Sequence, residues 1–242
     1  SANSLRITFL PTRRKRPTAA STPPAIIRPI DASRLKTYPL QRRHSKVQVS
    51  NFAKVWTKGR SFARFLDSLP DILAVKTLRE VAQAIAKAHR NGRPVIVGMG
   101  AHVVKVGLGP LLVDLMERGI VTALAMNGAV IIHDFELALM GHTSEEVDAE
   151  IDSGRFGMAE ETGRMLNEAI TLGMKEGQGL GESLGSYIHR RKQLFPHRAT
   201  SLLATGFRLG LPVTVHVAVG TDIIHMHPSA DGVLCRNVEA GR

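Results

Sequence analysis

The chain has 242 residues, of which 43% are hydrophobic and only 5% aromatic, enough for one mostly aliphatic α/β domain with additional segments. The single cysteine, Cys235, excludes an internal disulfide framework, and no apolar run reaches the roughly 18 residues that a membrane-spanning helix needs. We therefore expect a cytoplasmic protein with no membrane partner.

The net charge of +11 is concentrated near the N-terminus. Residues 1–60 hold 14 of the 32 Lys and Arg but only one of the 21 acidic residues, Asp31, which leaves the remainder of the chain at −2. The proline-rich, basic composition of residues 1–34 predicts a disordered tail. Nuclear targeting or nucleic-acid contact is an alternative role for the tail. A nucleic-acid-binding domain would instead spread its charge over a folded face, so nucleic acid is not the expected partner.

Residues 35–68 form a basic lead-in whose apolar side chains recur at helical spacing and are expected to dock on the body of the protein. The body itself, residues 69–242, begins with a helix that Thr77 caps, with Glu80 completing a capping box, and that stops at Asn91. Its apolar face comprises Leu78, Val81, Ala82, Ile85 and Ala88.

Three short apolar runs read as strands buried on both faces of a parallel sheet, at residues 94–99, 121–126 and 212–217. Helices are expected between them, at 111–116, 131–139, from Thr143, within 159–193 with a glycine-rich break, and at 201–208. This alternation predicts an α/β fold with a doubly wound, mostly parallel sheet.

Each predicted strand ends in small and polar residues, and ligands of such sheets bind at the carboxyl ends of the strands. The first end carries an incomplete dinucleotide-binding pattern, with two glycines and no third. The residues at the three ends are Gly98, Gly100, Ala101 and His102; then Asn127, Gly128 and Ala129; then Gly220, Thr221 and Asp222.

His133 and Asp134 follow on the helix after the second strand. Adjacent helical residues do not face each other, so the two do not form a dyad, but one of them could point into the strand-end crevice. His133 is suited to acid–base chemistry near neutral pH, and a purely structural role is the alternative.

A metal-dependent hydrolase is a less favoured interpretation of Asp222, His225 and His227. The two histidines would share a face of an extended segment, but a zinc or iron site usually needs three well-placed protein ligands. We therefore assign no metal site.

In order and spacing, these motifs resemble the deoxyhypusine synthase family, and specifically its bacterial, deoxyhypusine synthase-like branch. The resemblance rests on residues 94–139, including Gly98 to Gly107 and Asn127 to Glu136, and on residues 212–228, and it extends over about residues 38–232. It implies a Rossmann-like fold that binds NAD, active sites between the subunits of a homotetramer, and transfer of an aminobutyl group from spermidine or a related polyamine to a lysine or amine acceptor, which could be a protein.

The same resemblance implies roles for individual residues. Gly100, Ala101 and His102, together with Asn127, Gly128 and Ala129, match the turns that contact the cofactor. His133 and Asp134 fall where the family has a Glu-Asp pair, and Asp222 matches an aspartate lining the cofactor and polyamine pocket. We accordingly predict His133, Asp134 and Asp222 as catalytic and the two turns with Asp222 as cofactor-binding.

Two departures from the family bear on the activity. Histidine replaces a carboxylate at His133, which weakens a site for a polycation. The sequence after Gly232 no longer resembles the family, so the domain is expected to be incomplete at the C-terminus and to lack the Gly-rich cofactor loop and the imine-forming lysine. The alternative function is therefore an NAD- or metabolite-binding module without catalysis. The choice between NAD and NADP stays open.

Overall fold

The computed structural model describes residues 31–218 and 220–231. Most of the predicted tail, and the divergent end that follows residue 231, lie outside the described residues. The chain divides into two units, Ser1–Gln48 and Val49–Arg242. The described part of the first unit is fully exposed and contains two short 3-10 turns, η1 (Ala32–Arg34) and η2 (Leu40–Arg42).

The second unit alternates helices with three short strands. Its elements before the second strand are η3 (Val49–Asn51), α1 (Phe62–Ser68), α2 (Leu73–Arg90), β1 (Ile96–Met99), α3 (His102–Lys105) and α4 (Gly109–Glu117). They are followed by β2 (Ala123–Asn127), α5 (Gly128–Met140), α6 (Val147–Glu150), α7 (Glu160–Lys175), α8 (Leu180–Arg190), η4 (Arg198–Thr200), α9 (Leu202–Leu209), β3 (Val213–His216) and η5 (Ile223–Met226).

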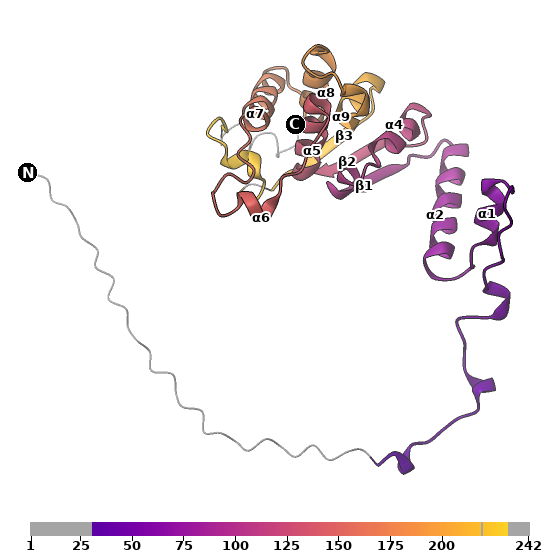
Figure 1. Ribbon diagram of the computed structural model, residues 1–242. Helices are drawn as coiled ribbons and strands as arrows, with labels where there is room; N and C mark the ends of the chain where they lie inside the picture. The colour runs from indigo at the N-terminus through magenta and orange to yellow at the C-terminus, as the bar shows by residue number, and fades with distance from the viewer. Residues whose placement is uncertain (1–30, 219, 232–242) are drawn as a thin grey trace, which may run out of the picture. The chain divides into compact units, whose positions relative to one another are not determined.

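The three strands form one parallel sheet in the order β1-β2-β3, which confirms the predicted strands and the α/β class (Figure 1). Leu124 of β2 pairs with Val97 on one side and with Val213 on the other. Because all three strands run the same way, their carboxyl ends meet at one edge of the sheet.

Burial alternates along each strand, which differs from the prediction of strands buried on both faces. Leu124 and Met126 are 1% and 2% exposed and face the helices, whereas Ile96 on the opposite face is 65% exposed. Thr214, also on the opposite face, is exposed. Within residues 31–218 and 220–231, the sheet is therefore well covered on one face only.

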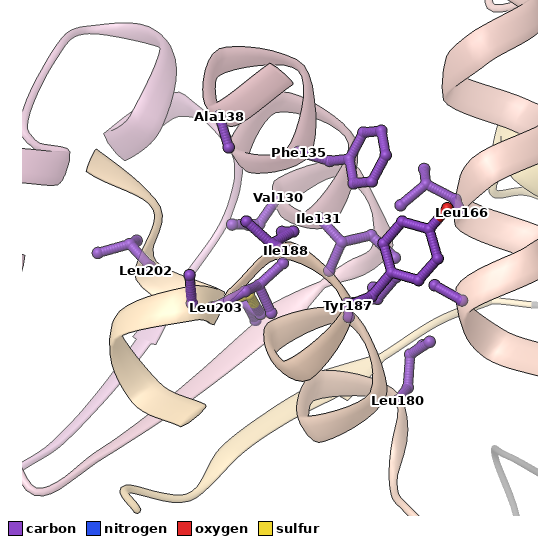
Figure 2. Packing of buried hydrophobic residues seen from close by; sticks show 14 of the residues in the cluster. Val130, Ile131, Phe135, Ala138, Leu166, Leu180, Tyr187, Ile188, Leu202 and Leu203 are labelled. Carbon is purple, nitrogen blue, oxygen red and sulfur yellow. The ribbon is translucent and has the colours of Figure 1, made fainter. Parts of the chain in front are cut away.

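The core lies between the covered face of the sheet and helices α5, α7, α8 and α9. Phe135 and Phe195 are fully buried and meet edge to face with ring centroids 5.1 Å apart, a favoured aromatic geometry. Figure 2 shows Phe135 and Tyr187 pointing toward Leu166 of α7, so one apolar cluster joins helices from distant parts of the chain.

Helix α2 begins earlier than predicted, at Leu73, and the predicted cap was wrong. Ile72 is the N-cap and offers no side-chain cap, while the hydroxyl of Thr77 lies inside the helix and donates to the Leu73 carbonyl. The capping pattern also fits an internal threonine, so it could not fix the start of the helix. No residue of α2 is buried, and Val81 on its apolar face is 50% exposed.

Helices α8 and α9 approach closely because glycine occupies position 185. A Cβ placed on Gly185 would lie 2.5 Å from the carbonyl oxygen of Leu203 and 2.9 Å from the Cβ of Phe207. The backbone carbonyl cannot move without shifting α9, so this contact tolerates only hydrogen at that position.

We expect Gly185→Ala to lower the free energy of unfolding by about 1–3 kcal/mol, because the cost of overpacking exceeds the gain in helix propensity. Gly109→Ala is the matched control, since its added methyl would only touch the Thr200 carbonyl oxygen at an ordinary 3.7 Å. Urea unfolding of both variants measures the difference. Equal stability of the two variants would contradict the close approach of α8 and α9.

Candidate functional site at the carboxyl ends of the strands

Two of the predicted clusters meet at the carboxyl edge of the sheet. A Cβ on Gly100 would lie 3.7 Å from the Nδ2 atom of Asn127, and Asn127 is the register partner of His216 on β3. His216 was not among the predicted site residues. The only signal for it was its position at the end of a predicted strand, where strand-end side chains converge.

Gly100, Asn127 and His216 form a row along the carboxyl edge of the sheet, which we call the strand-end row. Asn127 also has a structural role. It is the N-cap of α5, and its side-chain oxygen accepts a hydrogen bond from the Val130 amide at 3.3 Å. The cap fixes the side chain and directs its amide nitrogen toward Gly100.

The residues after β3 meet the residues after β2 through Asp222, whose side chain packs directly on Gly128. A Cβ on Gly128 would lie 2.4 Å from the carboxyl carbon of Asp222, so only glycine permits this contact. One carboxylate oxygen of Asp222 accepts a hydrogen bond from the Ala218 amide at 2.7 Å. The loop after β3 is thereby folded back over the start of α5.

The resulting charge distribution discriminates between ligand groups. The N-terminus of α5 would ordinarily favour a phosphate, but the carboxylate of Asp222 already lies beside it. A second anion there would be repelled, whereas hydroxyl, amide and ammonium groups would find an acceptor. This part of the carboxyl edge therefore suits a ribose or an amine better than a diphosphate.

The remaining predicted cofactor residues lie around the same edge. Ala101 is the N-cap residue of α3, and His102, at the start of that helix, is exposed. Ala129 is half-buried in the first turn of α5. Helix α3, which the sequence did not predict, is only a single turn and follows β1 directly.

His133 faces a polar cluster formed by α5, the loop after it and α7. Its Nδ1 atom lies 2.7 Å from the hydroxyl of Thr143, which also hydrogen-bonds Glu136. Thr162 donates a further hydrogen bond to Glu136 at 3.0 Å. Burial lowers the pKa of His133, the Glu136 carboxylate opposes this change, and Lys105 adds to it.

Asp134, predicted as catalytic, holds the N-terminus of α9. Its carboxylate is buried and accepts hydrogen bonds from the Ser201 hydroxyl at 2.6 Å and from the Leu202 and Leu203 amides at 2.7 and 3.3 Å. Burial raises the pKa of Asp134 to about 6, and these hydrogen bonds offset only part of the rise. The structure thus places Asp134 in the core and not beside the strand-end row.

His225 and His227 do not converge with Asp222 on a common point. His227 is buried against Gly163, and its Nδ1 atom lies 2.7 Å from the Ser229 hydroxyl. The Nδ1 atom of His225 is buried and has no hydrogen-bond partner among the described residues. Within these residues, no group of three or more His, Cys, Asp or Glu side chains is arranged to hold a metal ion.

A cavity of about 550 Å³ lies beside the strand-end row, along the outer edge of β3. It runs between the first turn of α8 and the end of α9, and Val215 and His216 contribute to its wall. The cavity and the strand-end row therefore share His216, although the cavity extends away from Gly100 and Asn127.

Comparisons with known proteins yield little for this chain. No protein-family model matches it, and no curated protein does. Among solved structures, an arginine dihydrolase, ArgZ, from the ornithine–ammonia cycle in cyanobacteria is similar, with 18% identity, a TM-score of 0.41, and coverage of 68% of this chain and 21% of that one. A putative LOR/SDH protein from Methanococcus maripaludis S2 has 15% identity, a TM-score of 0.40, and coverage of 84% and 54%.

The chain thus spans about a fifth and about half of the lengths of these two proteins. In the described part of the chain, no helix is both long and apolar enough to cross a membrane.

The raised pKa of Asp134 predicts a specific dependence of stability on pH. The folded state holds a proton up to about pH 6, whereas the unfolded chain releases it near the usual 3.8. The free energy of unfolding should therefore fall as the pH rises from 4 to 6, by on the order of 3 kcal/mol from this group.

Asp134→Asn removes this titration. The stability of the wild type relative to Asp134→Asn should accordingly decrease across pH 4–6 and be constant above pH 7, as measured by urea unfolding at each pH. Asp114→Asn, at an exposed aspartate of α4, serves as the control. A constant difference between wild type and Asp134→Asn across the whole range would show that burial does not dominate at this carboxylate.

Proposed function

We propose that the carboxyl edge of the sheet is the NAD site of a deoxyhypusine synthase-like transferase. The observation that carries the proposal is the convergence of Gly100, Asn127, Gly128 and Asp222 from separate segments at that edge. These are residues for which the family resemblance implies cofactor contacts.

The chemistry of these residues fits part of a dinucleotide. Among residues 31–218 and 220–231, only Asn127 Nδ2 lies within 4 Å of the position that a Cβ of Gly100 would take, so a ligand can come close to the backbone there. Asn127 Nδ2 would donate to a carbonyl or hydroxyl oxygen, and Asp222 would accept from a ribose hydroxyl. NAD, when bound, would supply the hydride acceptor.

For the substrate, we propose spermidine or a related polyamine, with aminobutyl transfer to a lysine or amine acceptor in a homotetramer. The support is the resemblance together with the negative charge of Asp222, which would attract an ammonium group. His133, a half-buried imidazole with a lowered pKa, would accept a proton from that ammonium group.

We further propose that the sheet is doubly wound, with α2 as the layer on its more exposed face. Two unburied apolar surfaces support this: the face of α2 that includes Val81 and Ile85, and the face of the sheet that includes Ile96 and Ala125. Only five residues separate the end of α2 from the start of β1, a length typical of helix–strand connections that pack back on the sheet.

This arrangement predicts different responses from the two sides of α2. Ile85→Glu would bury a carboxylate against the sheet and should lower the midpoint of thermal unfolding by several degrees, at about 4 °C or less per kcal/mol for a chain of this size. Gln83→Glu, on an exposed position of the same helix, should leave the midpoint unchanged. Equal midpoints for the two variants would exclude α2 as the second layer.

The cofactor proposal predicts saturable binding of NAD⁺ to the full chain in a calorimetric titration. Asp222→Asn should weaken binding about tenfold or more, because a hydrogen bond to a charged acceptor is lost. Asp114→Asn makes the same chemical change at an exposed site and should bind like the wild type. If the folded wild type does not bind NAD⁺, the proposal is wrong. If Asp222→Asn binds NAD⁺ as tightly as the wild type, the cofactor does not contact Asp222.

One observation favours the second candidate, a binding module without catalysis. Asp134, which with His133 falls where the family has a Glu-Asp pair, is buried and accepts hydrogen bonds from the start of α9. Incubation with NAD⁺ and spermidine separates the candidates, since product formation would exclude a pure binding module.

A further inference from the structure

The hydroxyl of Thr143 fixes which nitrogen of His133 carries the proton. A threonine hydroxyl has one hydrogen to donate, and here that hydrogen is directed to the Glu136 carboxylate. Toward His133 Nδ1, at 2.7 Å, the Thr143 oxygen can therefore only accept. Nδ1 must then be the donor, which leaves the lone pair of a neutral imidazole on Nε2.

The cluster is well built to maintain this arrangement. Glu136 lies one helical turn after His133 on α5, and its other carboxylate oxygen accepts from Thr162 on α7. The side chains of His133 and Glu136 are only 17% and 19% exposed, so water competes little for these hydrogen bonds. Thr143 follows α5 in the chain, and its position therefore depends on the folded loop between α5 and α7.

The surroundings also favour the uncharged form of the imidazole, because they lower the pKa of His133. Burial lowers the pKa of His133, and Lys105 of α3 acts in the same direction, while Glu136 opposes both. A neutral ring near pH 7 can accept a proton, which a protonated ring cannot.

His133 lies on the helix that begins at the strand-end site. It is five residues after Gly128, which corresponds to about 7.5 Å along the helix axis. Helices α3 and α5 contact each other, and both begin at the carboxyl edge of the sheet.

We propose that Thr143 and Glu136 are positioning residues that hold His133 as the Nδ1–H tautomer, with Nε2 as the proton acceptor for an ammonium group of the substrate. In the proton transfer, an N–H bond of the ammonium group breaks and an Nε2–H bond forms, leaving a neutral amine and an imidazolium whose Nδ1–H still points at Thr143. The tautomer stands independently of the proposed function, whereas the identity of the proton donor rests on it.

The tautomer can be read directly by long-range proton–nitrogen correlation NMR on the full chain labelled with ¹⁵N-histidine at pH 7.5. The His133 signals are assigned by their loss in His133→Asn. Free neutral histidine prefers the proton on Nε2, so we expect the reverse pattern in the wild type, with Nδ1 protonated and Nε2 bare. Protonated Nε2 in the folded wild type would overturn the proposal.

Three threonine variants test the cause. Thr143→Val removes the hydroxyl with little change in volume and should shift the major tautomer to Nε2–H, whereas Thr143→Ser keeps the hydroxyl and should retain Nδ1–H. Thr171→Val is the matched control, because the Thr171 hydroxyl donates to the Asn167 carbonyl within α7 and does not contact His133. An unchanged tautomer in folded Thr143→Val would show that Thr143 does not position His133. If Thr143→Val does not fold, loss of the Nδ1–H tautomer in Thr143→Ser would show the same.

The substrate part is tested on the same sample. Spermidine added to the NAD⁺-saturated protein should shift the Nε2 signal of His133 toward its protonated position, and Thr143→Val should reduce that shift. Saturable spermidine binding that leaves Nε2 unchanged would overturn the assignment of the proton donor. Failure of NAD⁺ binding with the Nδ1–H tautomer intact would overturn the proposed function but leave the positioning role standing.

Discussion

The carboxylate of Asp134 connects two helices of the layer that covers the sheet, α5 and α9. It extends from the middle of α5 and receives the first amides of α9, a helix that lies 68 residues later and leads directly into β3. Removing the carboxylate would leave the Ser201 hydroxyl and two backbone amides buried without an acceptor. The position of β3, and with it the strand-end row, depends on this buried carboxyl group as a hydrogen-bond acceptor.

The same helix carries both the structural carboxylate and the proposed proton acceptor. Asp134 faces the core and His133, its neighbour in the sequence, faces the loop after α5, as the 100° step between adjacent helical residues requires. The two neighbours therefore present an imidazole to the polar cluster around Thr143 and a carboxylate to the core. The negative charge of the strand-end row is then supplied by Asp222, from the loop after β3.

The alternation of apolar strands and amphipathic helices was sufficient to predict the parallel sheet and its three strands. It could not predict that each strand is buried mainly on one face, because a run such as Val95 to Val97 is apolar at every position whichever face is covered. The start of α2 was also predicted wrongly, because Thr77 followed by Glu80 gives the same sequence pattern whether the threonine caps a helix or lies inside one.

At the candidate site, the positions of Asn127, Gly128 and Asp222 at strand ends indicated that these residues would lie close together, and Asp222 does pack on Gly128. The role of Asp134 depends on a contact with residues 201–203, which are far away in the sequence and carry no local signal. Thr143 and Glu136 were overlooked for a similar reason, because a threonine and a glutamate separated by seven residues do not form a recognisable motif without the turn that joins them.

The glycines of α8 have a consequence for how this protein can change over evolutionary time. Gly181 lies against the carbonyl of Val213 on β3, and Gly185, one turn later, lies against the carbonyl of Leu203 on α9. Here the bare backbone of a helix serves as a packing surface, so two positions four residues apart are closed to every larger side chain. Exposed polar residues can be substituted far more easily than this pair of glycines. Distant relatives should therefore be easier to recognise by the spacing of these glycines than by the residues that contact a ligand.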